Sequence, residues 1–303
     1  MLAIVIPYYK LTFFESTLQS LVDQTDQRFK VYIGDDASQE DPTVLLEKYQ
    51  GQFNFVYLRF DENLGGISLV QQWDRCIAMT EEEEWIMILG DDDYISENYI
   101  EEFYKNIDEI ERLNIKVVHF ASRVHEANGE ISELYSHPKI ENSTDFFYRK
   151  FFQNSRGSLS EQMFKREAYL KHGFRDFPIG WGADDFAWLD FSEFGEIYAI
   201  NNATSYFRFS SENISRSGYN EEVKTEARYL YFTIIISKYL KKFKIEQRLM
   251  LLFYYEQLVY GSNKVSLRFW MRLIKLFILE NELFQVFKFT RRLLIYLLKK
   301  WNH

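Results

Sequence analysis

The chain has 303 residues, of which 47% are hydrophobic and 27% are charged, and its formal net charge is -9. This length allows one large domain or two smaller ones, with enough apolar residues for a sizeable core. The acidic balance argues against a protein that binds nucleic acid through its phosphates, so no nucleic-acid partner is expected. A single cysteine, Cys76, excludes an intramolecular disulfide and any cysteine-rich zinc site.

The first 120 residues alternate short apolar runs with amphipathic stretches. Strands are expected at the β-branched apolar runs, which cover 2–6, 30–33, 53–58, 85–89 and 115–120. Helices are expected where apolar residues recur at helical spacing, over 14–22, 43–49, 68–79 and 98–113. Strand–helix–strand units of this size predict an α/β fold, with a mostly parallel sheet flanked by helices.

Polar clusters follow three of the predicted strands. They are Pro7-Tyr8-Tyr9, Asp35-Asp36 and Asp91-Asp92-Asp93. In open α/β sheets, ligands bind beyond the carboxyl ends of the strands, so these clusters are expected at one ligand-binding edge. The alternative is that they are ordinary polar loops, although neighbouring acids would then repel one another without a counter-charge.

The triplet Asp91-Asp92-Asp93 has the chemistry of a site for a hard divalent cation. Mg²⁺ and Mn²⁺ prefer oxygen ligands and are often bound by one or two carboxylates together with substrate phosphates. The spacing excludes an EF-hand, because Ser96 stands where that loop needs glycine. The alternative is a solvated turn in which Asp93 caps the following helix.

A second acidic pair, Asp184-Asp185, follows the aromatic and glycine-rich segment Gly180–Gly182. A carboxylate next to an aromatic surface can have a raised pKa and act as a general base. The alternative is that one of the two acids caps a helix. Further along, Arg208 and Arg216 could bind diphosphate oxygens through the guanidinium fork, or could be ordinary surface residues.

Several common signatures are absent from the sequence. There is no P-loop, no dinucleotide-binding glycine motif and no nucleophile elbow. The histidines show no zinc-protease spacing, and each is interpreted as a core or surface residue; they are His119, His125, His137, His172 and His303.

Taken in order, five segments resemble the family-2 glycosyltransferases with the GT-A fold, over about residues 1–216. The segments are AIVIPYY at 3–9, FKVYIGDDAS at 29–38, NLGG at 63–66, LGDDDYI at 89–95 and GADD at 182–185. They are similar to the opening strand and turn, the Asp-Asp-Gly-Ser-type loop, the loop before the nucleotide-side helix, the Asp-x-Asp-Asp segment and the base motif of that family.

The resemblance implies where a nucleotide-sugar donor would bind. Pro7, Tyr8 and Asp36 would line the pocket of the nucleotide base, with Tyr8 stacking on the ring and Asp36 accepting a hydrogen bond from it. Asp91 would lie near the ribose. Arg208 would contact the diphosphate. UDP is the expected nucleotide.

The resemblance also implies the metal site and the general base. Asp92, assisted by Asp93, would hold Mn²⁺ or Mg²⁺ on the donor diphosphate. Asp185 would be the general base, with Asp184 as the second candidate. The sequence departs from the family pattern where Gly90 replaces the usual first acid, and where Ser210 stands near the place of a common histidine.

The domain organisation predicted from these patterns has two parts. A GT-A catalytic domain would cover 1–220, with nucleotide-sugar binding in 1–120 and the acceptor side in 121–220. A helical C-terminal extension would cover 221–303, with strongly helical patterns over 222–260 and 267–300. No secretory signal or transmembrane segment is predicted, so we expect a cytoplasmic protein.

The C-terminal extension is basic, unlike the rest of the chain. Residues 264–303 contain nine Lys and Arg against two Glu, interleaved with apolar and aromatic residues at near-helical spacing. This pattern is typical of an anchor at an anionic membrane surface, here the inner face of the cytoplasmic membrane, through 267–300. The alternative is a helical hairpin that packs on the catalytic domain or on a second subunit of a homo-oligomer.

The function expected from these features is inverting transfer of a sugar from a nucleotide-diphosphate donor to an acceptor hydroxyl. The acceptor would be a carbohydrate or a lipid-linked sugar, and family habit suggests bacterial surface polysaccharide synthesis. One alternative is a catalytically silent nucleotide-sugar-binding protein. Another is a sugar nucleotidyltransferase, although the glycine-rich basic loop expected near its N-terminus is missing.

Overall fold

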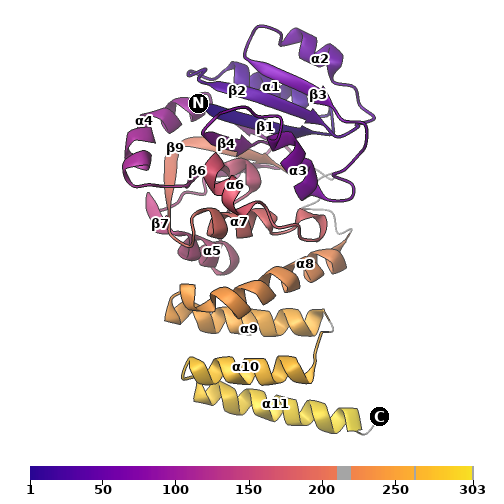
Figure 1. Cartoon of the computed structure of the whole chain (residues 1–303), viewed down its shortest axis with the longest axis vertical. Helices are drawn as coiled ribbons and strands as arrows, with labels where there is room; N and C mark the ends of the chain where they lie inside the picture. The colour runs from indigo at the N-terminus through magenta and orange to yellow at the C-terminus, as the bar shows by residue number, and fades with distance from the viewer. Residues whose placement is uncertain (210–219, 263, 302–303) are drawn as a thin grey trace. The chain divides into compact units, whose positions relative to one another are not determined.

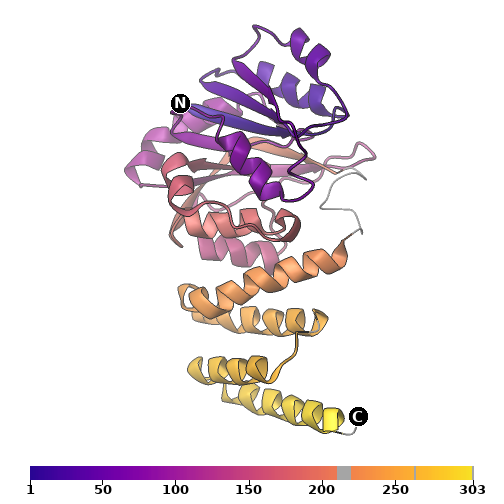
Figure 2. The same cartoon turned by 45° about the vertical axis from the view of Figure 1, so that its right-hand side comes forward.

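The structure is a computed structural model that describes residues 1–209, 220–262 and 264–301. It divides into two compact units, Met1–Asn220 and Glu221–His303, which are described separately. Figures 1 and 2 show a sheet with helices on both sides in the first unit and helices alone in the second.

Within the described residues, the first unit contains a nine-stranded sheet in the order β3-β2-β1-β4-β8-β6-β9-β5, with β7 paired to β9. The strands are β1 (Leu2–Tyr8), β2 (Phe29–Asp35), β3 (Phe55–Arg59), β4 (Trp85–Ile88), β5 (Tyr94–Ile95), β6 (Val117–His125), β7 (Ile140–Asn142), β8 (Gln162–Lys165) and β9 (Glu196–Arg208). The helices are α1 (Phe14–Val22), α2 (Thr43–Lys48), α3 (Leu69–Ile77), α4 (Tyr99–Arg112), α5 (Ser143–Phe152), α6 (Arg166–His172) and α7 (Ala183–Phe191), with short 3₁₀ turns η1 (Leu159–Glu161) and η2 (Pro178–Gly180).

The predicted α/β fold with helices on both sides of a sheet is confirmed. Strands β3, β2, β1 and β4 form the predicted parallel half. The other half is mixed, because β8 runs antiparallel to both β4 and β6, while β6 and β9 are parallel. The carboxyl ends of β2, β1 and β4 therefore lie next to one another at a single edge.

Strand β1 lies at the centre of the parallel half, and its residues Leu2–Ile6 are all buried. The sequence predicted that Pro7 ends this strand, but the strand continues to Tyr8 and Pro7 pairs with Gly34 of β2. Proline lacks the N–H group that a central strand residue donates. Pro7 is tolerated here because the pairing of β1 with β4 has already stopped at Val5.

The second unit contains four α-helices within the described residues, which confirms the predicted helical extension. They are α8 (Glu221–Ile234), α9 (Ile245–Gly261), α10 (Leu267–Leu279) and α11 (Leu283–Trp301). The predicted helical stretch 222–260 is interrupted by a π-helical segment, Ile235–Tyr239, and a 3₁₀ turn, Leu240–Lys242. The stretch 267–300 breaks at Asn281, whose φ of 60° ends α10 in the left-handed conformation. No described helix combines the length and apolarity needed to cross a membrane.

Candidate active site

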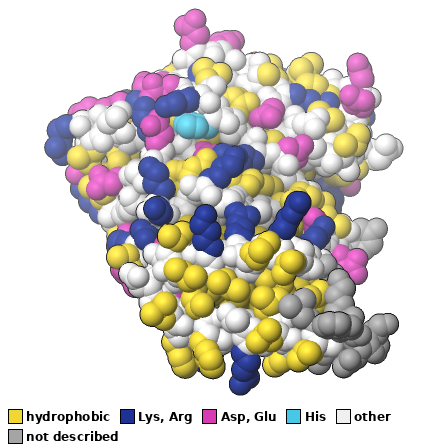
Figure 3. All heavy atoms as spheres, turned by 60° about the horizontal axis from the view of Figure 1, so that its bottom comes forward, with side chains coloured by type: hydrophobic (Ala, Val, Ile, Leu, Met, Phe, Trp, Pro, Cys, Tyr) yellow, Lys and Arg dark blue, Asp and Glu magenta, His cyan; other side chains and the backbone are white. Residues whose placement is uncertain are grey.

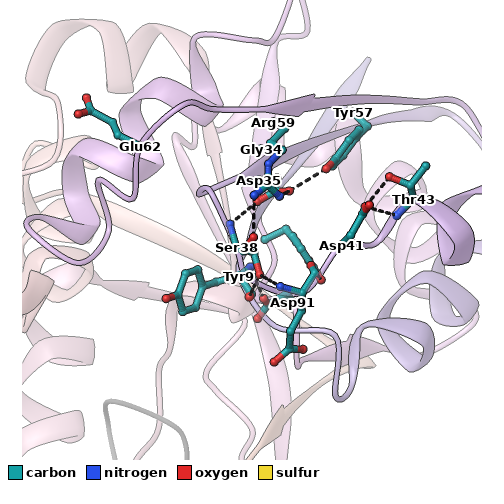
Figure 4. A network of polar contacts seen from close by, with 12 residues as sticks. Tyr9, Gly34, Asp35, Ser38, Asp41, Thr43, Tyr57, Arg59, Glu62 and Asp91 are labelled. Carbon is teal, nitrogen blue, oxygen red and sulfur yellow. Dashed lines mark hydrogen bonds and ion pairs between the residues drawn. The ribbon is translucent and has the colours of Figure 1, made fainter.

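The ends of β1, β2 and β4 are joined by hydrogen bonds, which Figure 4 shows around Ser38. The Ser38 hydroxyl donates to the backbone oxygen of Tyr9 (2.5 Å), and the Ser38 backbone N–H donates to Asp35 (2.8 Å). The backbone N–H of Tyr9 in turn donates to Asp91 Oδ2 at 2.7 Å. The three polar clusters that the sequence places after separate strands thus meet at one edge of the sheet.

Asp36 lies below the loop that leads from β3 into α3. Its carboxylate accepts hydrogen bonds from the backbone N–H groups of Leu64 (2.7 Å) and Gly65 (2.9 Å), and it forms an ion pair with Arg75. Burial raises the pKa of Asp36, although these donors oppose the rise. Asp36 therefore holds this loop in place. The guanidinium of Arg75 contacts the Asp36 carboxylate and also lies over the Phe60 ring.

Tyr8, the predicted stacking residue, is fully buried. Its ring packs against Phe14, with centroids 4.7 Å apart, and its hydroxyl donates to the backbone oxygen of Glu40 at 2.6 Å. Burial raises the pKa of this phenol. The stacking role predicted for Tyr8 therefore does not fit its position, and the accessible ring beside it belongs to Tyr9, which is 40% exposed. Pro7 precedes both residues within β1.

Asp91 links the loop after β4 to the loop after β1. Its Oδ2 atom accepts from the backbone N–H groups of Tyr9 (2.7 Å) and Lys10 (2.8 Å). Burial, followed by the charge of Asp92, raises the pKa of Asp91 to about 7. Asp91 therefore braces this edge of the sheet, and its contact with a ribose stays a prediction.

Asp93 is buried and tied to two other elements. One carboxylate oxygen accepts from the backbone N–H of Arg208 (2.9 Å) and the other from the hydroxyl of Ser160 (2.6 Å). Burial and the charge of Asp92 raise the pKa of Asp93 well above its usual value. Asp92 itself is more exposed than Asp93.

The donor set of this acidic loop fits a hard divalent cation. Burial and the charge of Asp92 raise the pKa of both Asp91 and Asp93, so their ionised forms are unfavourable. A cation bound by oxygen ligands would offset this repulsion. Of the two predicted metal ligands, Asp92 and Asp93, Asp93 is buried and accepts from protein donors at both oxygens, whereas Asp92 is partly exposed.

Arg208, at the end of β9, is fixed against the same loop. Its Nε atom donates to the backbone oxygen of Asp92 (3.1 Å), its guanidinium lies over the Phe13 ring (4.4 Å), and a further nitrogen donates to Ser16 (3.2 Å). Arg208, Phe13 and Ser16 line an open hollow of about 520 Å³. The other two residues of this predicted segment, Arg216 and Ser210, lie outside the described residues.

The second acidic pair stands in the first turn of α7. Gly182, with φ of 81°, leads into the helix in a conformation that favours glycine. Asp185 forms an ion pair with Lys150 of α5. Burial and the charge of Asp185 raise the pKa of Asp184 to about 6. The positive end of the helix dipole favours carboxylates at this position.

The segment η1 connects the two acidic groups. Ser160 donates to Asp93 and accepts from the backbone N–H of Gly90 at 3.1 Å. Its neighbour Glu161 is fully buried, and its charge helps to raise the pKa of Lys150. These residues form a buried polar network that is hydrogen-bonded to the acidic loop after β4 and that acts on Lys150, the partner of Asp185, through the charge of Glu161.

Two histidines belong to this network as well. His119 and His137 are buried with stacked rings, 3.6 Å between centroids, and their ligand atoms lie within 4.8 Å of one another and of Glu161. Such a set could hold an ion. However, Arg149 donates to His137 Nδ1 (3.1 Å) and Arg156 pairs with Glu161, so a cation would meet two guanidinium groups. This arrangement favours a protein-only network.

Sequence reasoning did not find the partners of the acidic residues. Lys150, Arg75, Ser160 and Glu161 carry no motif of their own, and each is identified only by the carboxylate or histidine that it contacts. The signal that could have pointed to them is physical, because buried carboxylates require donors or cations nearby.

Comparisons with known proteins place these features in context. Residues 3–173 match the family model described as glycosyl transferase family 2. Glycosyltransferase GlyG of Streptococcus pneumoniae serotype 4 is 26% identical over 110 residues, which are 36% of this chain and 36% of that protein. The match thus spans about a third of that relative's length.

Among solved structures, S. aureus TarS residues 1–349 in complex with UDP-GlcNAc is similar with a TM-score of 0.64 and 16% identity, over 90% of this chain and 78% of that one. GalNAc-T7 with UDP, GalNAc and Mn²⁺ is similar with a TM-score of 0.55 and 12% identity, over 92% of this chain and 57% of that one. These likenesses support the predicted GT-A fold.

Proposed function

Because the chain belongs to glycosyl transferase family 2, we propose that it transfers a sugar from a nucleotide-diphosphate donor to an acceptor hydroxyl, with inversion at the anomeric carbon. The observation that carries this proposal is a cation-type acidic loop, Asp91–Asp93, hydrogen-bonded to η1, whose Glu161 also acts through its charge on Lys150, the ion-pair partner of the carboxylate pair Asp184-Asp185. A transferase of this kind needs both a place for the donor diphosphate and a base for the acceptor.

On the donor side, the proposal places the nucleotide at the edge formed by β2, β1 and β4. Tyr9, rather than Tyr8, is the ring accessible to a base, and Asp36 with Arg75 lies at the adjoining loop. Arg208 is held beside Asp92, where its guanidinium could meet diphosphate oxygens. We expect a UDP-sugar.

Asp92, assisted by Asp93, would hold Mn²⁺ or Mg²⁺. When bound, the ion would supply positive charge for the departing diphosphate. Asp91 keeps the loop that carries these residues attached to β1, and Ser160 fixes the Asp93 carboxylate. Both contacts hold the ligands in place before the donor arrives, which lowers the cost of binding it.

On the acceptor side, Asp185 would act as the general base, and Asp184 is the second candidate. The acceptor O–H proton moves to the carboxylate while the acceptor oxygen bonds to the anomeric carbon. The bond from that carbon to the diphosphate oxygen breaks, and the diphosphate leaves with the electron pair. A single displacement of this kind inverts the configuration at the anomeric carbon.

The acceptor we propose is a carbohydrate or lipid-linked sugar, in bacterial surface polysaccharide synthesis at the cytoplasmic face of a membrane. Helix α11 supports this location. Its side chains at Phe284, Phe287, Leu294 and Leu298 are each at least 56% exposed and share one helical face. Figure 3 shows apolar side chains gathered on the face of the molecule that it brings forward, with Lys and Arg around them. A surface of this composition suits an anionic bilayer.

The test is UDP release from UDP-glucose, UDP-galactose and UDP-GlcNAc, with water or a sugar as acceptor, with and without Mn²⁺. We expect turnover that depends on Mn²⁺ with at least one donor. Asp92→Asn should remove the Mn²⁺-dependent part of UDP binding, and Asp185→Asn should bind UDP normally but lose at least about 100-fold in turnover. Mn²⁺-dependent UDP binding without turnover in the wild type would favour a silent binding protein instead.

A further inference from the structure

Lys150, in α5, contacts the carboxylate pair at the start of α7. Its Nζ atom forms an ion pair with Asp185 Oδ1, and the two side chains are 20% and 10% exposed. The charges of Asp185, Asp184 and Glu161 all favour the protonated form of Lys150 and raise its pKa despite burial. Lys150 is therefore a fixed positive charge between α5, α7 and η1.

The ion pair uses only one oxygen of Asp185. Among the described residues, Oδ2 of this carboxylate has no hydrogen-bond partner, whereas Oδ1 is held by Lys150. The ion pair at Oδ1 restricts rotation of the Asp185 carboxylate and therefore restricts the orientation of Oδ2. This is the arrangement that a general base needs, because the proton it accepts must arrive along one direction.

The charges around Asp185 make the cation necessary. Asp184 is its neighbour in α7, and the charge of Glu161, in η1, acts on the same lysine as the pair does. Despite burial, which raises the pKa of Glu161, a hydrogen bond with His119 and the charge of Arg156 lower it to about 2. On α7, Asp190 pairs with Arg175; on α6, Lys171 pairs with Glu193, Arg166 with Glu83 and Glu167 with Lys116. Lys150 is thus the partner that directly opposes the repulsion between Asp184 and Asp185.

We propose that Lys150 is the positioning residue of the transfer reaction: it pairs with Asp185 at Oδ1 and leaves the Oδ2 oxygen for the acceptor hydroxyl. This inference rests on the proposed function, in which Asp185 is the base. During the step, the acceptor proton moves to Oδ2 and Lys150 stays protonated, so Lys150 exchanges no proton. The alternative is that the ion pair merely ties α5 to α7.

The pH profile of donor hydrolysis distinguishes a positioning role of Lys150 from a purely structural one. With UDP-GlcNAc and Mn²⁺, Lys150→Met should move the acid limb of kcat/KM to higher pH by at least one unit, since an opposite charge at this range lowers a carboxyl pKa by about 1–3 units. Lys150→Arg should restore most of that shift. The matched control, Arg175→Met, removes another ion pair of α7 and should leave the limb unchanged. An acid limb of Lys150→Met that coincides with the wild type overturns the proposal.

A second measurement needs no turnover. The pKa of Asp184 is already raised to about 6 and should rise further without Lys150, so the variant should lose more stability than the wild type as the pH rises. The difference in Tm between the wild type and Lys150→Met should therefore widen from about pH 5 to about pH 7.5, and adding Asp185→Asn should abolish the widening. A Tm difference independent of pH indicates a purely structural tie and overturns the inference. Full turnover by Asp185→Asn alone would instead overturn the proposed base.

Discussion

The acidic residues of the candidate site differ in how many of their oxygen atoms the protein already uses. Asp36 and Asp91 each accept two backbone N–H groups, and Asp93 accepts one N–H group and one hydroxyl. Asp185 is held at a single oxygen by Lys150. Asp36 and Asp93 are held at both carboxylate oxygens, and Asp91 is held by two backbone groups at Oδ2 alone, so these three brace loops around the site; Asp185 has only the Lys150 contact, at Oδ1. A string of acids in a sequence does not distinguish these roles.

The stacked histidines predict a stability that falls in mild acid. Burial lowers the pKa of both His119 and His137, so both are neutral in the folded state, while in the unfolded chain they take up protons near pH 6.5. The contribution of the two histidines to the free energy of unfolding should be constant above that pH and fall below it by about 1.4 kcal/mol per histidine per pH unit. Urea unfolding at about pH 7.5 and about pH 5.5 measures the difference.

Two variants assign this loss to the buried pair. His137→Gln should flatten the fall, because one of the two protonation sites disappears. His172→Gln is the matched control, since its side chain is 24% exposed and should leave the pH dependence as in the wild type. The same pH dependence in His137→Gln as in the wild type would contradict the prediction.

At the scale of elements, local pattern predicted much of the parallel half of the sheet. The helix over Phe14–Val22 has the predicted bounds, because its apolar residues recur at helical spacing and face one side. Strand β8 was not predicted, since its four residues insert antiparallel between β4 and β6, which are distant in sequence. The same limit applies to the site. Asp185 stood in a recognisable motif, but Lys150 is 35 residues away and meets it only through the fold.

The loop between β3 and α3 depends on Gly65. A Cβ atom at this position would lie 2.6 Å from Asp36 Oδ2, and that carboxylate cannot move away without losing Arg75 and two backbone partners. Gly65→Ala should therefore lower the free energy of unfolding by about 1–3 kcal/mol and weaken UDP binding about tenfold or more. Denaturant unfolding and calorimetric titration with UDP and Mn²⁺ measure the two effects.

Gly261→Ala, at the end of α9, is the control for the Gly65 substitution. The nearest atom to its added Cβ belongs to Thr225, at 4.0 Å, so the substitution should be neutral or stabilise α9 by up to about 1 kcal/mol. UDP binding should not change. If Gly65→Ala binds UDP as tightly as Gly261→Ala does, the loop held by Asp36 does not belong to the nucleotide site.

At the scale of the whole molecule, charge and exposed apolar surface are unevenly distributed. The chain is acidic overall at -9, yet α11 contains Lys and Arg and no acidic residue. Inside the second unit, Trp270 and Phe289 pack together with ring centroids 4.3 Å apart. The outward side chains Phe287 and Leu294 of α11 remain 71% and 56% exposed. Folding of this unit thus leaves a basic, apolar helical face uncovered by the described residues.

This face predicts binding to anionic vesicles. Each Lys or Arg near an anionic bilayer contributes about 1 kcal/mol, and the apolar side chains add their burial. The full chain should sediment with phosphatidylglycerol vesicles much more than with phosphatidylcholine vesicles, and high salt should release it. Phe287→Glu with Leu294→Glu should reduce binding at least about tenfold, without loss of Tm, because both side chains are exposed.

The control must separate the surface from its added charge. Leu170→Glu with Ile245→Glu introduces the same charges at side chains that are 72% and 72% exposed, one in α6 and one in α9, and should bind vesicles like the wild type. Light scattering without lipid tests the alternative occupant, a second copy of the chain. If the α11 substitutions dissociate a dimer while both double variants bind vesicles equally, this face mediates self-association. The two outcomes can be separated because only the bilayer interaction requires an anionic lipid.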